Sequence, residues 1–273
     1  MKVGEEIFET RACGRLRKEK IVPMIGDRVA LSENCDLVTE ILPRKSSFIR
    51  PPVANVDQMV IVASPISPQI DLLLVDTLIL QNEISGIDTV LCLNKTDLVD
   101  ESTVEQIADI YKNAGYKTIF ASALNNRGGE QLKTVLKGKI TAFAGNSGVG
   151  KSSILNLLNK DFGLETGSIS RIERGRHTTR HVELLPLEDD TFVVDTPGFS
   201  RLEIPTLCAE DISAYFKDFA LYSKDCKFRG CTHIDEPGCA VKIALENGTI
   251  GASRYTNYKY FYGKLKDIKK WQL

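Results

Sequence analysis

The chain has 273 residues, of which 42% are hydrophobic and 26% are charged, and its net charge is −1. A chain of this length exceeds one average domain and can bury a sizeable core, so we expect two or three globular domains. The near-zero net charge gives no sign of a nucleic-acid partner, although it leaves room for a local basic face.

Other protein classes are excluded by simple patterns. No run of about 18 apolar residues is present, as a membrane span would require. The stretch from Met1 to Glu6 contains acidic residues and no apolar segment, which argues against a signal peptide. Seven cysteines in a chain this long do not suit a secreted disulfide scaffold. We therefore expect a cytoplasmic protein that does not bind membranes. We also expect it to act as a monomer.

Residues 1–52 consist of short strand-like pieces separated by turn signals. Alternating apolar and polar residues in Arg28–Leu31 and Leu37–Leu42 predict a small β-barrel or sheet. Pro51 and Pro52 interrupt either a helix or a strand ladder, so we place a domain boundary there.

Residues 53–205 alternate buried strands with helices, which predicts a doubly wound α/β domain. Continuous apolar runs predict mainly parallel strands at Gln58–Ala63, Thr89–Leu93, Thr118–Ala121, Ile140–Ala144 and Phe192–Val194. Helical spacing predicts helices at Ile70–Glu83, Ser102–Ala114 and Ser152–Leu158. Ser102 and Glu105 match a capping box, and His181–Val194 has the pattern of an antiparallel hairpin.

Residues 206–273 lack strand signals. Helical patterns cover Ala209–Phe219, Cys239–Glu246 and Ala252–Trp271, and a cysteine cluster lies between the first two. The last helix combines aromatic residues with lysines, and Arg15–Lys20 forms a second basic stretch. Basic and aromatic faces suit RNA, whereas a solvated helix face or turn explains these stretches equally well.

A phosphate-binding loop follows the predicted strand Ile140–Ala144 and precedes a predicted helix. The pattern G-x-x-x-x-G-K-S lets backbone N–H groups surround phosphate oxygens at a helix N-terminus. Lys151 would reach the β- and γ-phosphates, and Ser152 would bind Mg²⁺. The expected GTP-binding residues of this loop are Gly145, Asn146, Ser147, Gly148, Val149, Gly150, Lys151, Ser152 and Ser153.

A guanine-reading motif lies upstream of the phosphate loop, after the predicted strand Thr89–Leu93. In Asn94-Lys95-Thr96-Asp97, the Asp97 carboxylate can accept two hydrogen bonds from guanine, which adenine does not offer. Asn94 would contact the base edge, and the stem of Lys95 would cover the ring. Ser122 and Ala123 end another strand and would contact guanine O6. Considered alone, a four-residue motif of this kind could also occur by chance or serve to cap a helix.

A third motif, Asp195-Thr196-Pro197-Gly198, follows the run Phe192–Val194. Asp195 would lie beside Mg²⁺, and Gly198 would donate its N–H to the γ-phosphate. Phe199 stands where many GTPases place a water-orienting glutamine, so catalysis needs another group.

His177 is the candidate for that group. It lies in the polar stretch Gly175–Arg180, where Thr179, or alternatively Thr178, would complete the Mg²⁺ shell. An exposed histidine that contacts RNA is the competing interpretation.

Cys226, Cys231, His233 and Cys239 offer four metal ligands within fourteen residues. A closed Cys₃His shell is typical of structural zinc and leaves no position for a catalytic water. Such a site would stabilise a C-terminal unit that has little apolar core. Unrelated core cysteines or a redox pair are the alternatives.

The order of these motifs is rotated relative to ordinary GTPases, in which the phosphate loop comes first. With Gly26-Asp27, Arg50–Gln58, Gly175–Arg180 and the Cys₃His cluster, the chain resembles the RsgA (YjeQ) family of small-ribosomal-subunit biogenesis GTPases. The resemblance implies an α/β fold with a central circularly permuted P-loop GTPase domain at 53–205. It also implies an N-terminal OB-fold-like β-barrel at 1–52 and a C-terminal, mostly helical zinc-binding domain at 206–273. An OB-fold needs five strands, and 52 residues leave little room for them. The barrel is therefore expected to be shortened.

The resemblance also implies a function. The family acts late in assembly of the 30S subunit, contacts 16S rRNA, and hydrolyses GTP to GDP and phosphate with one Zn²⁺ and with Mg²⁺ bound to GTP. Hydrolysis is stimulated by the 30S subunit, with a switch-region histidine as catalyst, here His177. The alternative hypotheses are a GTP-regulated RNA-binding adaptor with incidental hydrolysis and a GTPase directed to tRNA or mRNA.

Overall fold

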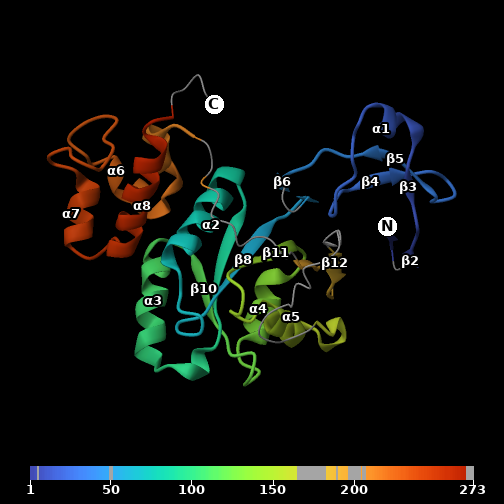
Figure 1. Ribbon diagram of the computed structural model, residues 1–273, viewed down its shortest axis with the longest axis horizontal. Coiled ribbons are helices and arrows are strands. Elements are labelled where there is room, and N and C mark those ends of the chain that lie inside the picture. The colour runs from blue at the N-terminus through green and yellow to red at the C-terminus, as the bar shows by residue number, and fades with distance from the viewer. Residues whose placement is uncertain are drawn as a thin grey trace, which may run out of the picture.

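The computed structural model describes residues 1–4, 6–48, 52–164, 183–188, 190–195, 204 and 207–268. A central α/β part lies between a strand-rich N-terminal part and a helical C-terminal part (Figure 1). No helix within these ranges is both long and apolar enough to cross a membrane.

The central part is built on a six-stranded sheet with the order β10-β9-β8-β11-β13-β12. Its strands are β8 (Gln58–Ala63), β9 (Asp88–Leu93), β10 (Lys117–Phe120), β11 (Ile140–Ala144), β12 (Glu183–Pro186) and β13 (Phe192–Asp195). All neighbours are parallel except β12 and β13, which form the predicted antiparallel hairpin with Glu183 opposite Asp195. The predicted α/β architecture is confirmed.

Helices cover both faces of this sheet. They are α2 (Leu72–Ser85), α3 (Glu101–Asn113), α4 (Gly129–Leu136) and α5 (Lys151–Leu158), with short 3₁₀ turns η1 (Thr96–Leu98) and η2 (Lys160–Phe162). All six residues of β8 are buried, because Met59 and Ile61 pack toward α2 and α3 while Val60 and Val62 pack toward α4 and α5. Burial on both faces explains the continuous apolar runs in the sequence.

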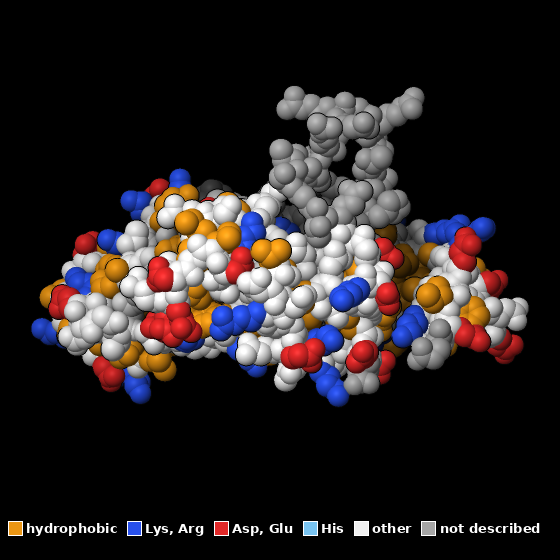
Figure 2. Space-filling model, turned by 90° about the horizontal axis from the view of Figure 1, so that it is seen from below, with side chains coloured by type: hydrophobic (Ala, Val, Ile, Leu, Met, Phe, Trp, Pro, Cys, Tyr) orange, Lys and Arg blue, Asp and Glu red, His pale blue; other side chains and the backbone are white. Residues whose placement is uncertain are grey.

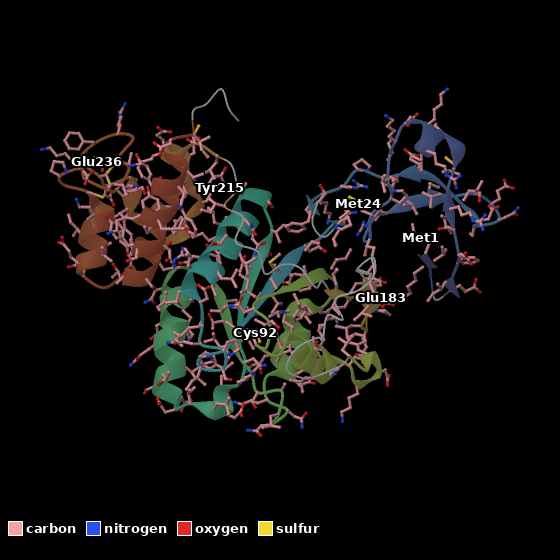
Figure 3. All side chains as sticks on the ribbon, in the orientation of Figure 1. Met1, Met24, Cys92, Glu183, Tyr215 and Glu236 are labelled. Atoms are coloured by element: carbon pink, nitrogen blue, oxygen red, sulfur yellow. The ribbon has the colours of Figure 1, made fainter. Side chains whose placement is uncertain are left out.

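Cys92 of β9 lies inside the sheet (Figure 3). Burial raises the pKa of its thiol to about 12, which keeps the group uncharged and unreactive.

Two details of the central part differ from the prediction. Ser102 does not cap α3, because Asp100 accepts hydrogen bonds from the Thr103 amide (2.8 Å) and the Ser102 hydroxyl (2.6 Å). A carboxylate one residue before the helix reaches these donors directly. Helix α4 was not predicted, since the glycine pair Gly128–Gly129 at its start is typical of a loop.

Among the residues described, the N-terminal part contains seven short strands in three separate small sheets. They are β1 (Lys2–Val3), β2 (Glu6–Ile7), β3 (Arg11–Ala12), β4 (Val29–Leu31), β5 (Leu37–Ile41), β6 (Ser47–Phe48) and β7 (Val53–Ala54). A closed OB barrel therefore stays a prediction. A short helix, α1 (Gly14–Lys18), carries the basic stretch that we had expected among strand-like pieces. It buries Leu16 and exposes Arg15 and Arg17.

The C-terminal part is helical, as predicted, and packs around aromatic side chains. Its elements are η3 (Ala209–Tyr215), α6 (Lys217–Ser223), α7 (Ala240–Glu246) and α8 (Ala252–Leu265). The helix expected at Ala209–Phe219 is broken at Phe216, whose backbone is extended and whose ring is buried. Helix α8 ends at Leu265 rather than continuing to Trp271, and its Tyr258 and Phe261 are core residues.

Candidate nucleotide and metal sites

The predicted phosphate loop turns sharply between β11 and α5. Gly145 has a φ of +136°, and a Cβ atom there would lie 2.1 Å from the carbonyl oxygen of Val62. Gly150 has a φ of +93° at the start of α5, so two positions of this loop require glycine. Lys151 Nζ donates to the carbonyl oxygens of Gly145 (2.7 Å) and Asn146 (2.9 Å), which holds the ammonium group over the loop.

Asn94 joins the predicted guanine and phosphate motifs. It follows β9 and is buried, and its Nδ2 donates to the carbonyl oxygen of Val149 (2.9 Å). Its Oδ1 accepts from the amide of Ala123 (3.2 Å), in the loop after β10. Because neighbouring strands of the parallel sheet end at the same edge, three loops from distant parts of the sequence meet at one side chain.

The other residues of the guanine motif surround Asn94. Thr96 donates from Oγ1 to the carbonyl oxygen of Ala121 (3.0 Å), while Asp97 lies exposed in η1. Ser122 is buried, and its hydroxyl accepts the Asn125 amide (3.1 Å). The structure thus brings the predicted GTP residues 94–97, 122–123 and 145–153 to one edge of the sheet.

The loop after β8 also reaches this edge, and sequence reasoning missed it. Lys95 Nζ donates to the carbonyl oxygens of Ser67 and of Gly148 (2.7 Å), so this lysine links the β8 loop to the phosphate loop. The Pro68 ring lies next to Gly148. A short polar and proline-containing segment directly after a buried parallel strand was the available signal.

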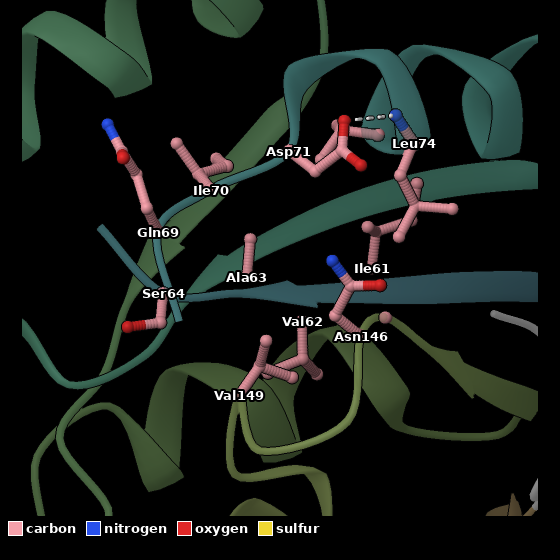
Figure 4. Close-up of a pocket in the computed structure, with 12 residues that line it drawn as sticks. Ile61, Val62, Ala63, Ser64, Gln69, Ile70, Asp71, Leu74, Asn146 and Val149 are labelled. Atoms are coloured by element: carbon pink, nitrogen blue, oxygen red, sulfur yellow. Dashed lines mark hydrogen bonds between the residues drawn. The ribbon is translucent and has the colours of Figure 1, made fainter. Parts of the chain in front are cut away.

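A small hollow, partly open to solvent, lies between this loop and the phosphate loop (Figure 4). Apolar residues such as Ile61 and Leu74 form its floor, and Ser64, Asp71 and Asn146 line it with polar groups. Asp71 caps α2 by accepting the amides of residues 73 and 74 at 3.1 and 3.0 Å.

Several predicted site residues lie outside the described part of the chain: His177, Thr178, Thr179 and Gly198. Asp195 ends β13, which runs parallel to β11 and therefore toward the same sheet edge as the phosphate loop.

The four predicted metal ligands come together in the C-terminal part. Their ligand atoms all lie within 4.8 Å of one another. Cys226 Sγ is 4.0 Å from Cys239 Sγ and 3.6 Å from His233 Nδ1, and His233 Nδ1 is 3.3 Å from Cys239 Sγ. A tetrahedral ion with typical Zn–S and Zn–N bonds would place such atoms about 3.6–3.8 Å apart. This cluster can therefore hold a metal ion.

The surroundings orient the histidine toward such an ion. His233 Nε2 lies 3.3 Å from the hydroxyl of Ser223, which itself donates to the Phe219 carbonyl (2.7 Å) and so can accept the ring N–H. This arrangement leaves Nδ1 available as a ligand. Tyr255 donates to the carbonyl oxygen of His233 (2.7 Å), which ties the loop to α8.

Two further features describe the metal cluster. Burial raises the pKa of the Cys231 thiol to about 12, so binding of an ion has to release protons. Glu236, labelled in Figure 3, accepts the amides of Thr232 (2.8 Å) and Ile234 (3.1 Å) and closes the loop between the ligands.

The sheet order and the shared edge of the motifs define a P-loop GTPase whose motifs are circularly permuted. The family model described as RsgA GTPase matches residues 41–205, and that described as RsgA N-terminal domain matches residues 1–36. The chain belongs to the RsgA GTPase family and is a GTP hydrolase.

Relatives match almost the whole chain. The small ribosomal subunit biogenesis GTPase RsgA of Alkaliphilus metalliredigens is 44% identical over 277 residues, covering 99% of this chain and 95% of that protein. The protein of the same name from a Geobacillus species is 44% identical over 271 residues, covering 97% and 92%.

Solved structures agree with this assignment. YjeQ from Thermotoga maritima has a TM-score of 0.81 at 36% identity, covering 95% of this chain and 90% of that chain. YloQ, whose structure is described as a circularly permuted GTPase, has a TM-score of 0.78 at 36% identity, covering 95% and 86%.

Proposed function

We propose that this GTPase binds the small ribosomal subunit or its late precursor in the cytoplasm and acts as a monomer during subunit maturation. The subunit stimulates hydrolysis of GTP to GDP and phosphate, and hydrolysis releases the protein. The observation that carries this proposal is the meeting of permuted guanine and phosphate motifs at one sheet edge, in a chain that matches named small-subunit biogenesis GTPases over nearly its full length.

The site residues divide the work of hydrolysis. The loop 145–153 and Lys151 bind the phosphates, while Asp97, supported by Asn94 and the loop at 122–123, selects guanine. Ser152, Thr179 and Asp195 hold Mg²⁺, which offsets charge on the transferred phosphoryl group. The N–H of Gly198 binds the γ-phosphate. His177 orients the attacking water, a task that Phe199 cannot perform.

The Cys₃His cluster binds one structural zinc ion. The donor set and the spacing of its atoms support this assignment, since four protein ligands complete a tetrahedral shell. The ion stabilises the C-terminal helical domain. We propose that this domain begins at residue 206, and that the N-terminal domain ends at residue 52.

The 16S rRNA is the proposed contact of the exposed basic groups. Arg15, Arg17 and Lys18 project from α1, and Lys259 and Lys264 from α8. Tyr258 and Phe261 are not available to stack on RNA bases, because both rings are buried in the C-terminal core. On the face shown in Figure 2, basic and acidic side chains are interspersed, so RNA contact depends on local groups.

Hydrolysis assays with purified 30S subunits test the proposal. GTP turnover should rise strongly on addition of 30S subunits, whereas ATP should not be hydrolysed. His177→Ala should abolish the stimulated rate and leave the protein bound to the subunit, while His181→Ala is the matched control and should retain the rate.

Two results would contradict this function. Equal turnover with and without 30S subunits would remove the ribosomal trigger. Normal release of the His177→Ala variant from the subunit would support the adaptor hypothesis. At present the names of the relatives, which are those of GTPases, argue against that hypothesis.

A further inference from the structure

Helix α2 is buried on two sides. Leu74, Leu78 and Ile79 pack into the core beneath the sheet, whereas Leu80 belongs to the core of the C-terminal part. Figure 1 shows α2 between the sheet and α8. A helix that is hydrophobic all round is typical of this position between two layers.

A buried ionic network fastens α2 to the C-terminal helices. Arg254 of α8 donates from Nη1 to Asp76 Oδ1 of α2 (2.7 Å) and makes two bonds, of 2.7 and 3.0 Å, to Asp218 of α6. None of the three side chains is more than 2% exposed. Asn257 Nδ2 adds bonds to Asp76 Oδ2 (2.6 Å) and to the Leu72 carbonyl oxygen (3.1 Å). Because a buried charge without its partner is costly, α2 and α8 are held as one unit.

The same N-terminal end of α2 reaches the nucleotide site. The helix begins after Asp71, immediately beyond the loop in which Ser67 accepts Lys95 Nζ and Pro68 lies beside Gly148. Lys95 and Gly148 belong to the two motifs that bracket the nucleotide. A ligand seated between these motifs therefore restrains the loop before α2.

We infer that the β8 loop (residues 64–71) and α2 couple guanine-nucleotide binding to the C-terminal helical part, through Asp76, Asn257 and Arg254. This connection is separate from the covalent one through residues 196–206. Nucleotide binding restricts the loop and the start of α2, and α8 becomes more firmly docked. By thermodynamic reciprocity, a change that loosens the docking of α8 also weakens the binding of the nucleotide.

Hydrogen–deuterium exchange on the full chain tests this coupling, with and without saturating GDP. We expect GDP to slow amide exchange in α8 by about fivefold or more, the lower range of typical coupling between sites. Asn257→Ala removes two bonds to α2 and leaves the Arg254 pairs in place, so it should still be saturated by GDP but lose this slowing.

Thr256→Ala is the matched control on the same helix. Its exposed hydroxyl bonds to the Ala252 carbonyl within α8 (2.9 Å) and to no other residue that the structure describes, so GDP should slow exchange as in the unaltered chain. If Asn257→Ala does not fold, as judged by circular dichroism, Asp76→Asn replaces it, since it removes the charge while retaining an oxygen for Arg254.

Two outcomes overturn the inference. One is unchanged exchange in α8 when GDP binds to the unaltered chain. The other is full GDP-dependent slowing in the folded Asn257→Ala or Asp76→Asn variant, which would place the coupling elsewhere.

Discussion

Gly150→Ala should weaken guanine-nucleotide binding by displacing Asn94. Gly150 has a φ of +93°, and an ideal Cβ atom there would lie 2.4 Å from Asn94 Nδ2. Heavy atoms do not approach so closely, so the asparagine amide has to leave its position between the loops.

The expected loss follows from the bonds that Asn94 makes. Its amide bonds to Val149 (2.9 Å) and Ala123 (3.2 Å) hold the phosphate and guanine loops together. Each such bond has a net worth of about 0.5–1.5 kcal/mol, so losing both costs roughly 1–3 kcal/mol. If this cost falls on the bound state, the GDP dissociation constant rises about 5- to 150-fold.

Displacement of a fluorescent GDP analogue measures this change, and Gly148→Ala is its control. Gly148 also has a positive φ, +82°, but the nearest atom to its Cβ would be Pro68 Cδ at 3.6 Å, an ordinary contact. Both variants carry the backbone strain, whereas only Gly150→Ala carries the clash.

A double-mutant cycle isolates the clash. In an Asn94→Ala background, Gly150→Ala should weaken GDP binding no more than Gly148→Ala does, because the strain remains and the clash with Asn94 is gone. The reasoning is refuted if Gly150→Ala binds as tightly as Gly148→Ala, or if its effect is unchanged when Asn94 is absent.

Three other predictions concern single side chains. Asp97→Asn should weaken GTP binding about tenfold or more without improving ATP binding, in the same displacement assay. Hydrogen bonds from the Ser102 hydroxyl and the Thr103 amide lower the pKa of Asp100 to about 2. Because this value lies below the ordinary one of about 3.9, the carboxylate stabilises α3 above about pH 4, and this contribution is lost as the pH falls toward 2. An NMR titration should find that midpoint, and Ser102→Ala should raise it. Cys226→Ser should abolish bound zinc, measured by elemental analysis, together with part of the helical dichroism.

The sequence predicts strand positions best where every residue of the strand is buried. The predicted bounds of β8 (Gln58–Ala63) and β11 (Ile140–Ala144) match the structure, because strands buried on both faces have no alternating pattern to misplace. The meeting of the guanine and phosphate motifs was predictable too, since parallel strands end at a common edge. The Cys₃His cluster was evident from spacing within fourteen residues.

Only the tertiary structure decided the rest. The break at Phe216 arises because its ring is buried among α6 and α8, which no local propensity records. Asp76 and Arg254 are 178 residues apart, and their pairing depends on α2 lying between two cores. Local chemistry therefore determined the strands, the loops and the ligand types. The partners of buried charges required the folded chain, because their energy depends on which distant groups exclude water around them.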